Sequence, residues 1–161
     1  MNAISKKGKT AAVILLALLV LSAWFYLHMR QKQGALNINC SAIIEYHHQA
    51  PDFVSTLELV FRLEENLEGY AMLAGNTHSD RGTDVISRTI HFSYVMKRPG
   101  EIEIADMRYV RNARDTADDD SFRRNFFYVP EGAVRQLRLQ PVSNGWLLGN
   151  VQSPFALCVS R

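Results

Sequence analysis

The segment LNINCSAIIEY, residues 36–46, alternates between apolar and polar side chains, and this alternation decides how the chain is expected to fold. Its even positions are all apolar: Leu36, Ile38, Cys40, Ala42, Ile44 and Tyr46. Successive side chains of a β-strand point to opposite faces, so a period of two predicts a strand with one buried face. Cys40 is expected on that buried face.

The same alternation returns in later segments. Residues 53–63 (FVSTLELVFRL) and 85–97 (VISRTIHFSYVMK) each place large apolar side chains on one face. Residues 101–110 (EIEIADMRYV) follow an adjacent proline and glycine, which favour a turn, so they are expected to return as the partner strand of a hairpin. Residues 76–84 are expected to form a loop.

Strand-like segments and turn signals continue towards the C-terminus. Asn144 and Gly145 form a dipeptide that strongly favours a short hairpin turn. Residues 111–125 (RNARDTADDDSFRRN) break the pattern with many charges and are expected to form a solvated loop or a short helix. Roughly six to eight short strands with little helix predict a small antiparallel barrel or a curved sheet.

A long apolar segment precedes these strands. Residues 11–27 (AAVILLALLVLSAWFYL) carry no charge, and two further residues bring the run close to the roughly 20 that cross a bilayer as a helix. We therefore expect a transmembrane helix over 11–29, after a tail over 1–10 and before a β-rich domain over 30–161. A cleaved signal peptide is the alternative, but its cleavage site needs small residues, and the best candidate begins with the bulky Leu21.

Charges beside the apolar segment predict its orientation. Lys6, Lys7 and Lys9 precede it, whereas Arg30 and Lys32 follow it. Positively charged flanks tend to stay in the cytoplasm, so the tail is expected there and the β-rich domain in the periplasm, outside the inner membrane. The chain has 18 basic and 16 acidic residues, so the domain without the tail is nearly neutral, and its charge does not favour direct nucleic-acid binding.

Cys40 and Cys158 are the two cysteines of the chain. The periplasm is oxidising, and paired cysteines there usually form a disulfide. This predicts a bond that joins the first strand of the domain to the last. Closing so long a loop restricts the unfolded chain by about 4–5 kcal/mol in the entropy model. The alternative is two buried thiols that act as small apolar side chains.

No residue pattern indicates an enzyme, a cofactor or a metal site. His47 and His48 are adjacent and point to opposite faces of a strand, which makes them poor joint ligands of a metal. With His78 and His91 they are candidates for pH sensing, and ordinary surface histidines are the alternative. The aspartates at 118–120 lack the ligand spacing of an EF-hand, and no serine lies in a Gly-x-Ser-x-Gly motif.

Aromatic side chains gather in the C-terminal third of the chain. Large aromatics usually pack in a core. Some could instead line a lipocalin-like interior that holds a small amphipathic ligand, such as a bile salt or a fatty acid, or contact a partner protein. The candidates for such a cavity or interface are Phe126, Phe127, Tyr128, Trp146 and Phe155.

Several segments resemble the FidL-like inner-membrane proteins of enteric bacteria. They are the lysine-bearing tail, the apolar segment, INCSAIIEY (38–46), FFYVPEG (126–132) and WLLGNVQSPFALCVSR (146–161). The resemblance implies an accessory partner of a membrane-spanning transcriptional regulator with a cytoplasmic winged-helix domain, similar to the ToxR–ToxS pairing. It further implies that the periplasmic domain binds and stabilises or modulates this regulator in response to a signal such as acid or bile. No site residue is carried over from the family.

Overall fold

The computed structural model describes residues 6–32, 35–49, 52–80, 82–125 and 134–161. The chain divides into two compact units, Met1–Gly34 and Ala35–Arg161. Among the residues described, the first unit contains one helix, and the strands belong to the second.

The first unit is built on α1, which runs from Lys6 to Lys32. The apolar side chains described between Val13 and Tyr26 are all largely exposed; that of Trp24, for example, is 64% exposed. Within the part of the chain that the structure describes, no helix combines the length and the hydropathy that crossing a membrane requires.

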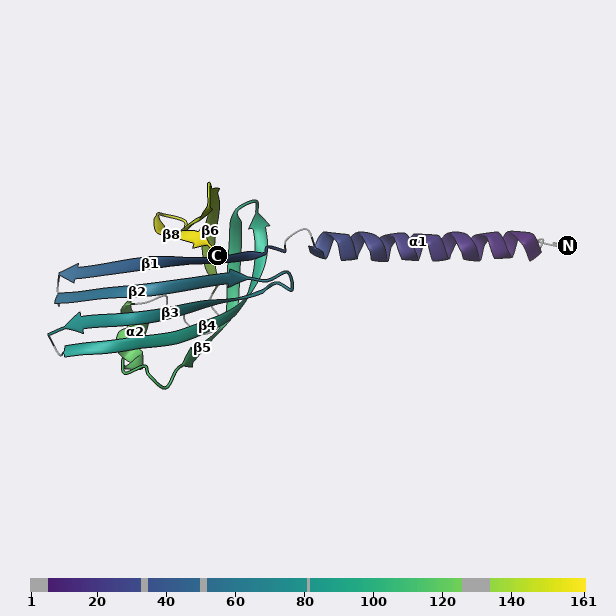
Figure 1. Ribbon diagram of the computed structural model, residues 1–161. Helices are drawn as coiled ribbons and strands as arrows, with labels where there is room; N and C mark the ends of the chain where they lie inside the picture. Colours follow the sequence, from purple (N-terminus) through teal and green to yellow (C-terminus); the bar gives the residue numbers. More distant parts are fainter. Residues whose placement is uncertain (1–5, 33–34, 50–51, 81, 126–133) are drawn as a thin grey trace. The chain divides into compact units, whose positions relative to one another are not determined.

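The second unit is a closed barrel in which every neighbouring pair of strands is antiparallel and β8 returns to β1. This confirms the expected small antiparallel barrel with little helix. The elements are β1 (Ile38–Gln49), β2 (Asp52–Leu63), β3 (Glu68–Ser79), β4 (Gly82–Arg98), β5 (Glu101–Arg111), α2 (Asp119–Asn125), β6 (Arg135–Val142), β7 (Gly145–Gly149) and β8 (Pro154–Ser160). Figure 1 shows β1 to β4 side by side as long strands.

The alternation of the sequence fills the barrel interior as predicted. Ile38, Cys40, Ala42 and Ile44 of β1 are buried, and the neighbouring Ile43 is 75% exposed. The alternating apolar residues of β2 and β4 join the same buried cluster, together with residues of β5 to β8. The core therefore lies inside the barrel, where each strand contributes every second side chain.

Turn positions were predicted well in two places and badly in a third. The hairpin between β4 and β5 turns at Gly100, which has a φ of 76°, and the hairpin between β6 and β7 turns at Asn144. The expected loop over 76–84 is wrong, because β3 and β4 continue as a paired ladder up to Ser79 and Gly82. Polar residues occupy the ladder here because one face of this end is exposed to solvent.

The hydrogen-bonded ladders between neighbouring strands of the barrel differ in length. The ladders that join β1 to β5 are long, but the ladder between β5 and β6 includes only residues 101–104 of β5. β8 pairs with β1 only through Cys40 and Ser41. Among the described residues, no strand pairs with the outer edge of β1 from Ala42 to Glu45. We call residues 42–45 of β1 the free edge.

Candidate functional site

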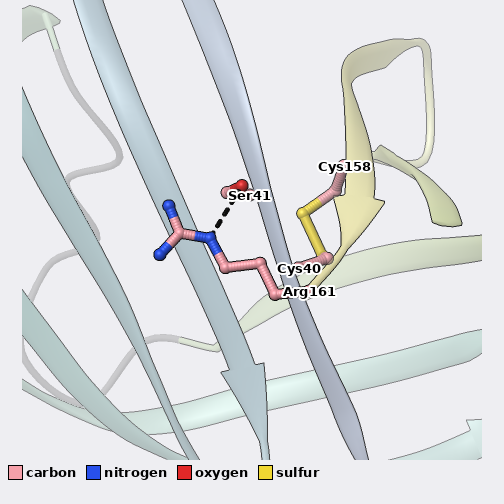
Figure 2. Close-up of a disulfide and its surroundings, with 4 residues drawn as sticks. All are labelled: Cys40, Ser41, Cys158 and Arg161. Atoms are coloured by element: carbon pink, nitrogen blue, oxygen red, sulfur yellow. Dashed lines mark hydrogen bonds between the residues drawn. A yellow bond between two sulfur atoms is a disulfide. The ribbon is translucent and has the colours of Figure 1, made fainter.

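A disulfide closes the seam between β1 and β8, as predicted. The Cys40 and Cys158 sulfur atoms are 2.05 Å apart and the Cα atoms 5.3 Å apart, and both residues are fully buried. Figure 2 shows the bond beside Arg161, whose Nε donates to Ser41 Oγ at 3.0 Å. The Arg161 guanidinium also pairs with the Glu58 carboxylate on β2. The disulfide of Cys158 and the contacts of Arg161 thus hold the last residues of the chain against β1.

The free edge begins where this seam ends. Ser41 pairs with Val159 in antiparallel register, so Ile43 and Leu157 are the next outward-facing residues on the two strands. Their side chains are 75% and 56% exposed, and that of Val159 is 42% exposed. An apolar group of side chains therefore lies outside the barrel, directly beside unpaired backbone of β1.

The structure does not gather His47, His78 and His91, the predicted histidines whose side chains it describes, into one site. His47 and His78 both lie in register with Val54, one strand away on either side, which separates them by about 10 Å. His91 lies opposite Tyr70, farther along β3 and β4. The side chain of His48 lies outside the described residues.

His78 and His47 have local contacts on the outer face of the sheet. His78 Nδ1 is 2.8 Å from Thr83 Oγ1, and His47 Nε2 is 3.8 Å from a Glu45 oxygen. Within the described ranges, no group of three or more His, Cys, Asp or Glu side chains is arranged to hold a metal ion.

Two of the five predicted aromatic residues can be placed. Trp146 and Phe155 are partly buried and pack against the core. Trp146 is the register partner of Cys158, so it lies beside the disulfide-bearing strand pair. Phe126, Phe127 and Tyr128 lie outside the described residues.

Phe155 helps to line an apolar cavity inside the barrel. The cavity measures about 40 Å³, well below the roughly 300–1,000 Å³ of pockets that hold drug-sized ligands. Its lining is apolar apart from Arg135, which is partly buried at the start of β6. Burial lowers the pKa of Arg135, although the nearby Tyr109 and Tyr46 oppose the shift. A guanidinium thus lies against the apolar interior, near tyrosines of β5 and β1.

A buried ion pair, which the sequence analysis missed, holds the segment between β5 and α2. The Arg88 Nε donates to Asp115 Oδ2 at 2.9 Å, and Arg88 Nη2 donates to Asp115 Oδ1 at 3.1 Å. Their side chains are 4% and 0% exposed. The backbone N–H of Ser87 donates to the same carboxylate at 2.9 Å, and Arg111 Nε lies 3.2 Å from its other oxygen.

The same arginine organises α2. Arg88 Nη1 donates to Asp119 Oδ1 at 2.8 Å, and Nη2 donates to the Ala117 carbonyl at 2.7 Å. The guanidinium lies 4.3 Å from the centre of the Phe122 ring, which meets Tyr109 edge-on. Burial alone would lower the pKa of Arg88, but the hydrogen bonds and charges of Asp115 and Asp119 outweigh burial and raise it.

The expected solvated loop or short helix over 111–125 is therefore only partly correct. α2 is the short helix, but Asp115 is buried rather than solvated. The signal was Arg88, which takes an inward position of β4 between Ile86 and Ile90. A charge among buried apolar residues requires a buried partner of opposite sign.

Comparisons with known proteins do not assign a family. No family model matches the chain, and neither a curated protein nor a solved structure resembles it significantly.

Proposed function

We propose that this chain is a membrane-anchored, non-enzymatic accessory protein whose β-rich domain binds another protein. The observation that carries the proposal is the free edge of β1, with the exposed Ile43 and Leu157 beside it. Unpaired strand edges are templates for pairing with another chain, and proteins usually shield them with charges, bulges or short strands.

The chemistry of the free edge suits an extended segment of a partner. Backbone groups supply the hydrogen bonds when a strand is added to a sheet, and alternate side chains supply the specificity. A partner strand beside β1 would bury Ile43 and Leu157, which are more exposed than the other large apolar side chains described in the strands. Removing this surface from water would favour the complex by about 25 cal/mol per Å².

The anchor in this proposal is the apolar segment 11–29 within α1. Its support is the uncharged run of the sequence and the exposed apolar side chains from Val13 to Tyr26. The tail over 1–10 would then lie in the cytoplasm and the domain over 30–161 in the periplasm, with the lysines of the tail as the retained flank. A disulfide between Cys40 and Cys158 is typical of an oxidising compartment.

The partner follows from the resemblance to the FidL-like proteins. It would be a membrane-spanning regulator with a cytoplasmic winged-helix domain, whose periplasmic domain supplies the strand. The described part of the chain contains no DNA-binding motif through which the protein could act on DNA without this partner. An effect on transcription would therefore pass through the regulator, which the β-rich domain would stabilise or modulate.

The test is co-purification of the regulator with the full-length protein from its native membrane. Ile43→Lys places a charge at the free edge, where lysine opposes the addition of a strand. Val95→Lys is the matched control, because Val95 is 46% exposed on the outer face of β4. We expect Ile43→Lys to lose the regulator and Val95→Lys to retain it. Equal recovery of the regulator with both variants would refute the docking site.

A second function is a small-ligand sensor, and Arg135 is the observation that favours it. A guanidinium against an apolar cavity suits a ligand with an anionic head and an apolar body, such as a fatty acid or a bile salt. The cavity of about 40 Å³ would have to widen to admit one. Thermal unfolding with a panel of both ligand classes tests this, and Arg135→Gln should abolish any stabilisation. No stabilisation of the wild-type protein by any ligand would eliminate the sensor.

A further inference from the structure

The backbone of β1 determines which groups of the free edge an added strand can use. The Arg161 N–H donates to the Asn39 carbonyl at 3.1 Å, so the peptide groups of Asn39 point towards β8. Along a strand, every second residue points its N–H and C=O groups to the same edge. Ile43 and Glu45 therefore present theirs at the free edge, where no described strand pairs with them. Each offers one N–H donor and one C=O acceptor to an added strand.

Glu45 adds a negative charge to this edge. Its side chain is 64% exposed, and its register partner on β2 is the neutral Thr56. The His47 Nε2 lies 3.8 Å from the Glu45 carboxylate, which is beyond hydrogen-bond distance. The neighbouring carboxylate of Glu58, by contrast, is already paired with the Arg161 guanidinium. The Glu45 carboxylate is therefore the one at this edge that suits a cation from an added strand.

A second copy of the chain is a poor occupant of the free edge. Antiparallel pairing of two free edges would set Ile43 of each copy opposite Glu45 of the other, an apolar side chain against a carboxylate. The strand of the second copy would then continue past Ala42 to Ser41, where Val159 of β8 already pairs. An occupant has to leave the sheet before it reaches β8. The free edge therefore suits a short segment of a different protein.

We propose that the free edge selects an extended partner segment with the pattern basic-x-apolar, where x is any residue. The segment runs antiparallel to β1, as β2 and β8 do. Its basic side chain lies opposite Glu45, and two residues later its apolar side chain lies opposite Ile43, beside the exposed Leu157. The segment then ends or turns away before β8. The inference rests on the proposed function and specifies the strand that the regulator supplies.

NMR titration of the full-length protein in detergent tests the pattern without the regulator. The probe is the synthetic peptide Thr-Lys-Thr-Val-Thr, and its reverse, Thr-Val-Thr-Lys-Thr, is the control of equal composition. We expect the probe to shift the amide signals of Ile43 and Glu45 and to bind about threefold more tightly than the reverse peptide.

A charge exchange tests the role of Glu45. Glu45→Lys sets like charges opposite each other, so it should weaken binding of the lysine probe about tenfold. The same variant should bind Thr-Glu-Thr-Val-Thr, in which the charge of the peptide is also reversed. Glu65→Lys is the matched control, because it makes the same charge change in the exposed turn after β2 and should leave binding unchanged.

Saturable shifts at Ile43 and Glu45 that follow the charge exchange support the pattern. The inference is overturned if no peptide shifts these two amides in a saturable way, if the reverse peptide binds as tightly as the probe, or if Glu45→Lys and Glu65→Lys bind the lysine probe equally.

The regulator gives a separate measurement that distinguishes the two proposals. If Ile43→Lys loses the regulator and Glu45→Lys retains it, docking at the free edge stands and the basic-x-apolar pattern is wrong. If the lysine probe binds as expected but no regulator co-purifies with the wild-type protein, the pattern stands and the proposed function is wrong.

Discussion

Tyr94 shows how one side chain fixes the start of the barrel. It is 1% exposed, and its hydroxyl accepts a hydrogen bond from the Leu36 N–H at 2.8 Å. The same hydroxyl donates to the Glu64 carbonyl at 2.7 Å. Leu36 lies just before β1 and Glu64 just after β2, so Tyr94 of β4 joins segments that are far apart in the sequence. The alternation of β4 predicted that Tyr94 faces inward, but no local pattern predicts these partners.

Tyr94→Phe tests this role through stability and its pH dependence. Leaving the Leu36 N–H without its acceptor should lower the free energy of unfolding by about 1–3 kcal/mol. Burial raises the pKa of Tyr94 above 10.0, which favours the neutral phenol in the folded state. That contribution is present in full below the unfolded pKa of about 10 and is lost as pH rises through the folded value.

Urea denaturation between pH 7 and pH 11 measures both effects. We expect the wild-type protein to lose stability above about pH 10 and Tyr94→Phe to lose less over the same interval. Tyr70→Phe is the control, because its ring lies on the outer face of β3. An alkaline decline that is equally steep in wild type and Tyr94→Phe would contradict the account.

Asp115 gives a second residue-scale prediction. Removing one partner of a buried ion pair leaves the other charge buried, so Asp115→Ala should cost about 3–5 kcal/mol of stability. Asp119→Asn removes a carboxylate that is 60% exposed and should cost about 1 kcal/mol or less. Chemical denaturation of the two variants checks the difference. Equal costs would mean that Arg88 does not depend on its buried partner.

At the scale of elements, the weakest joint of the barrel is the seam between β1 and β8. Two register pairs join these strands, through Cys40 and Ser41, whereas β1 pairs with β2 along its whole length. The disulfide adds a covalent link at this joint and closes a loop with a sequence separation of 118. Compartment and position predicted the bond, but the shortness of the ladder beside it depends on register, which the sequence does not reveal.

Replacing both cysteines with alanine should therefore destabilise some strands more than others. We expect a loss of about 2–5 kcal/mol in overall stability. Amide hydrogen exchange should accelerate most in β8 and in the β7 residues paired with it, because these strands depend on the seam. β2 and β3 should change less. Uniform acceleration over all strands would contradict a local role for the disulfide.

Hairpins also show what the sequence could and could not predict. Adjacent proline and glycine, and the Asn144–Gly145 pair, each have a specific turn chemistry and marked their turns correctly. The end of the β3–β4 hairpin was misread because its polar residues resemble a loop. In the structure, Ser55 Oγ and Thr77 Oγ1 are 3.0 Å apart inside the barrel, so each hydroxyl satisfies the other. Such a pairing across two strands requires knowledge of the register.

At the scale of the whole chain, the barrel is a ring with one incomplete side. Short ladders of β6, β7 and β8 close it at one end, and the free edge of β1 begins where they stop. The sequence predicted the barrel because alternation is repeated in strand after strand. It could not predict the free edge, which results from how many residues of β8 reach β1.

The central claim is that this free edge is where a partner protein docks. The most direct measurement places a photo-crosslinking amino acid at position 43, or at position 95 as the control, and irradiates cells that hold the protein in its native membrane. Mass spectrometry then identifies the attached protein. We predict that position 43 captures the outer domain of a membrane-spanning winged-helix regulator and that position 95 does not. No adduct at position 43, or the same adduct at both positions, would contradict the claim.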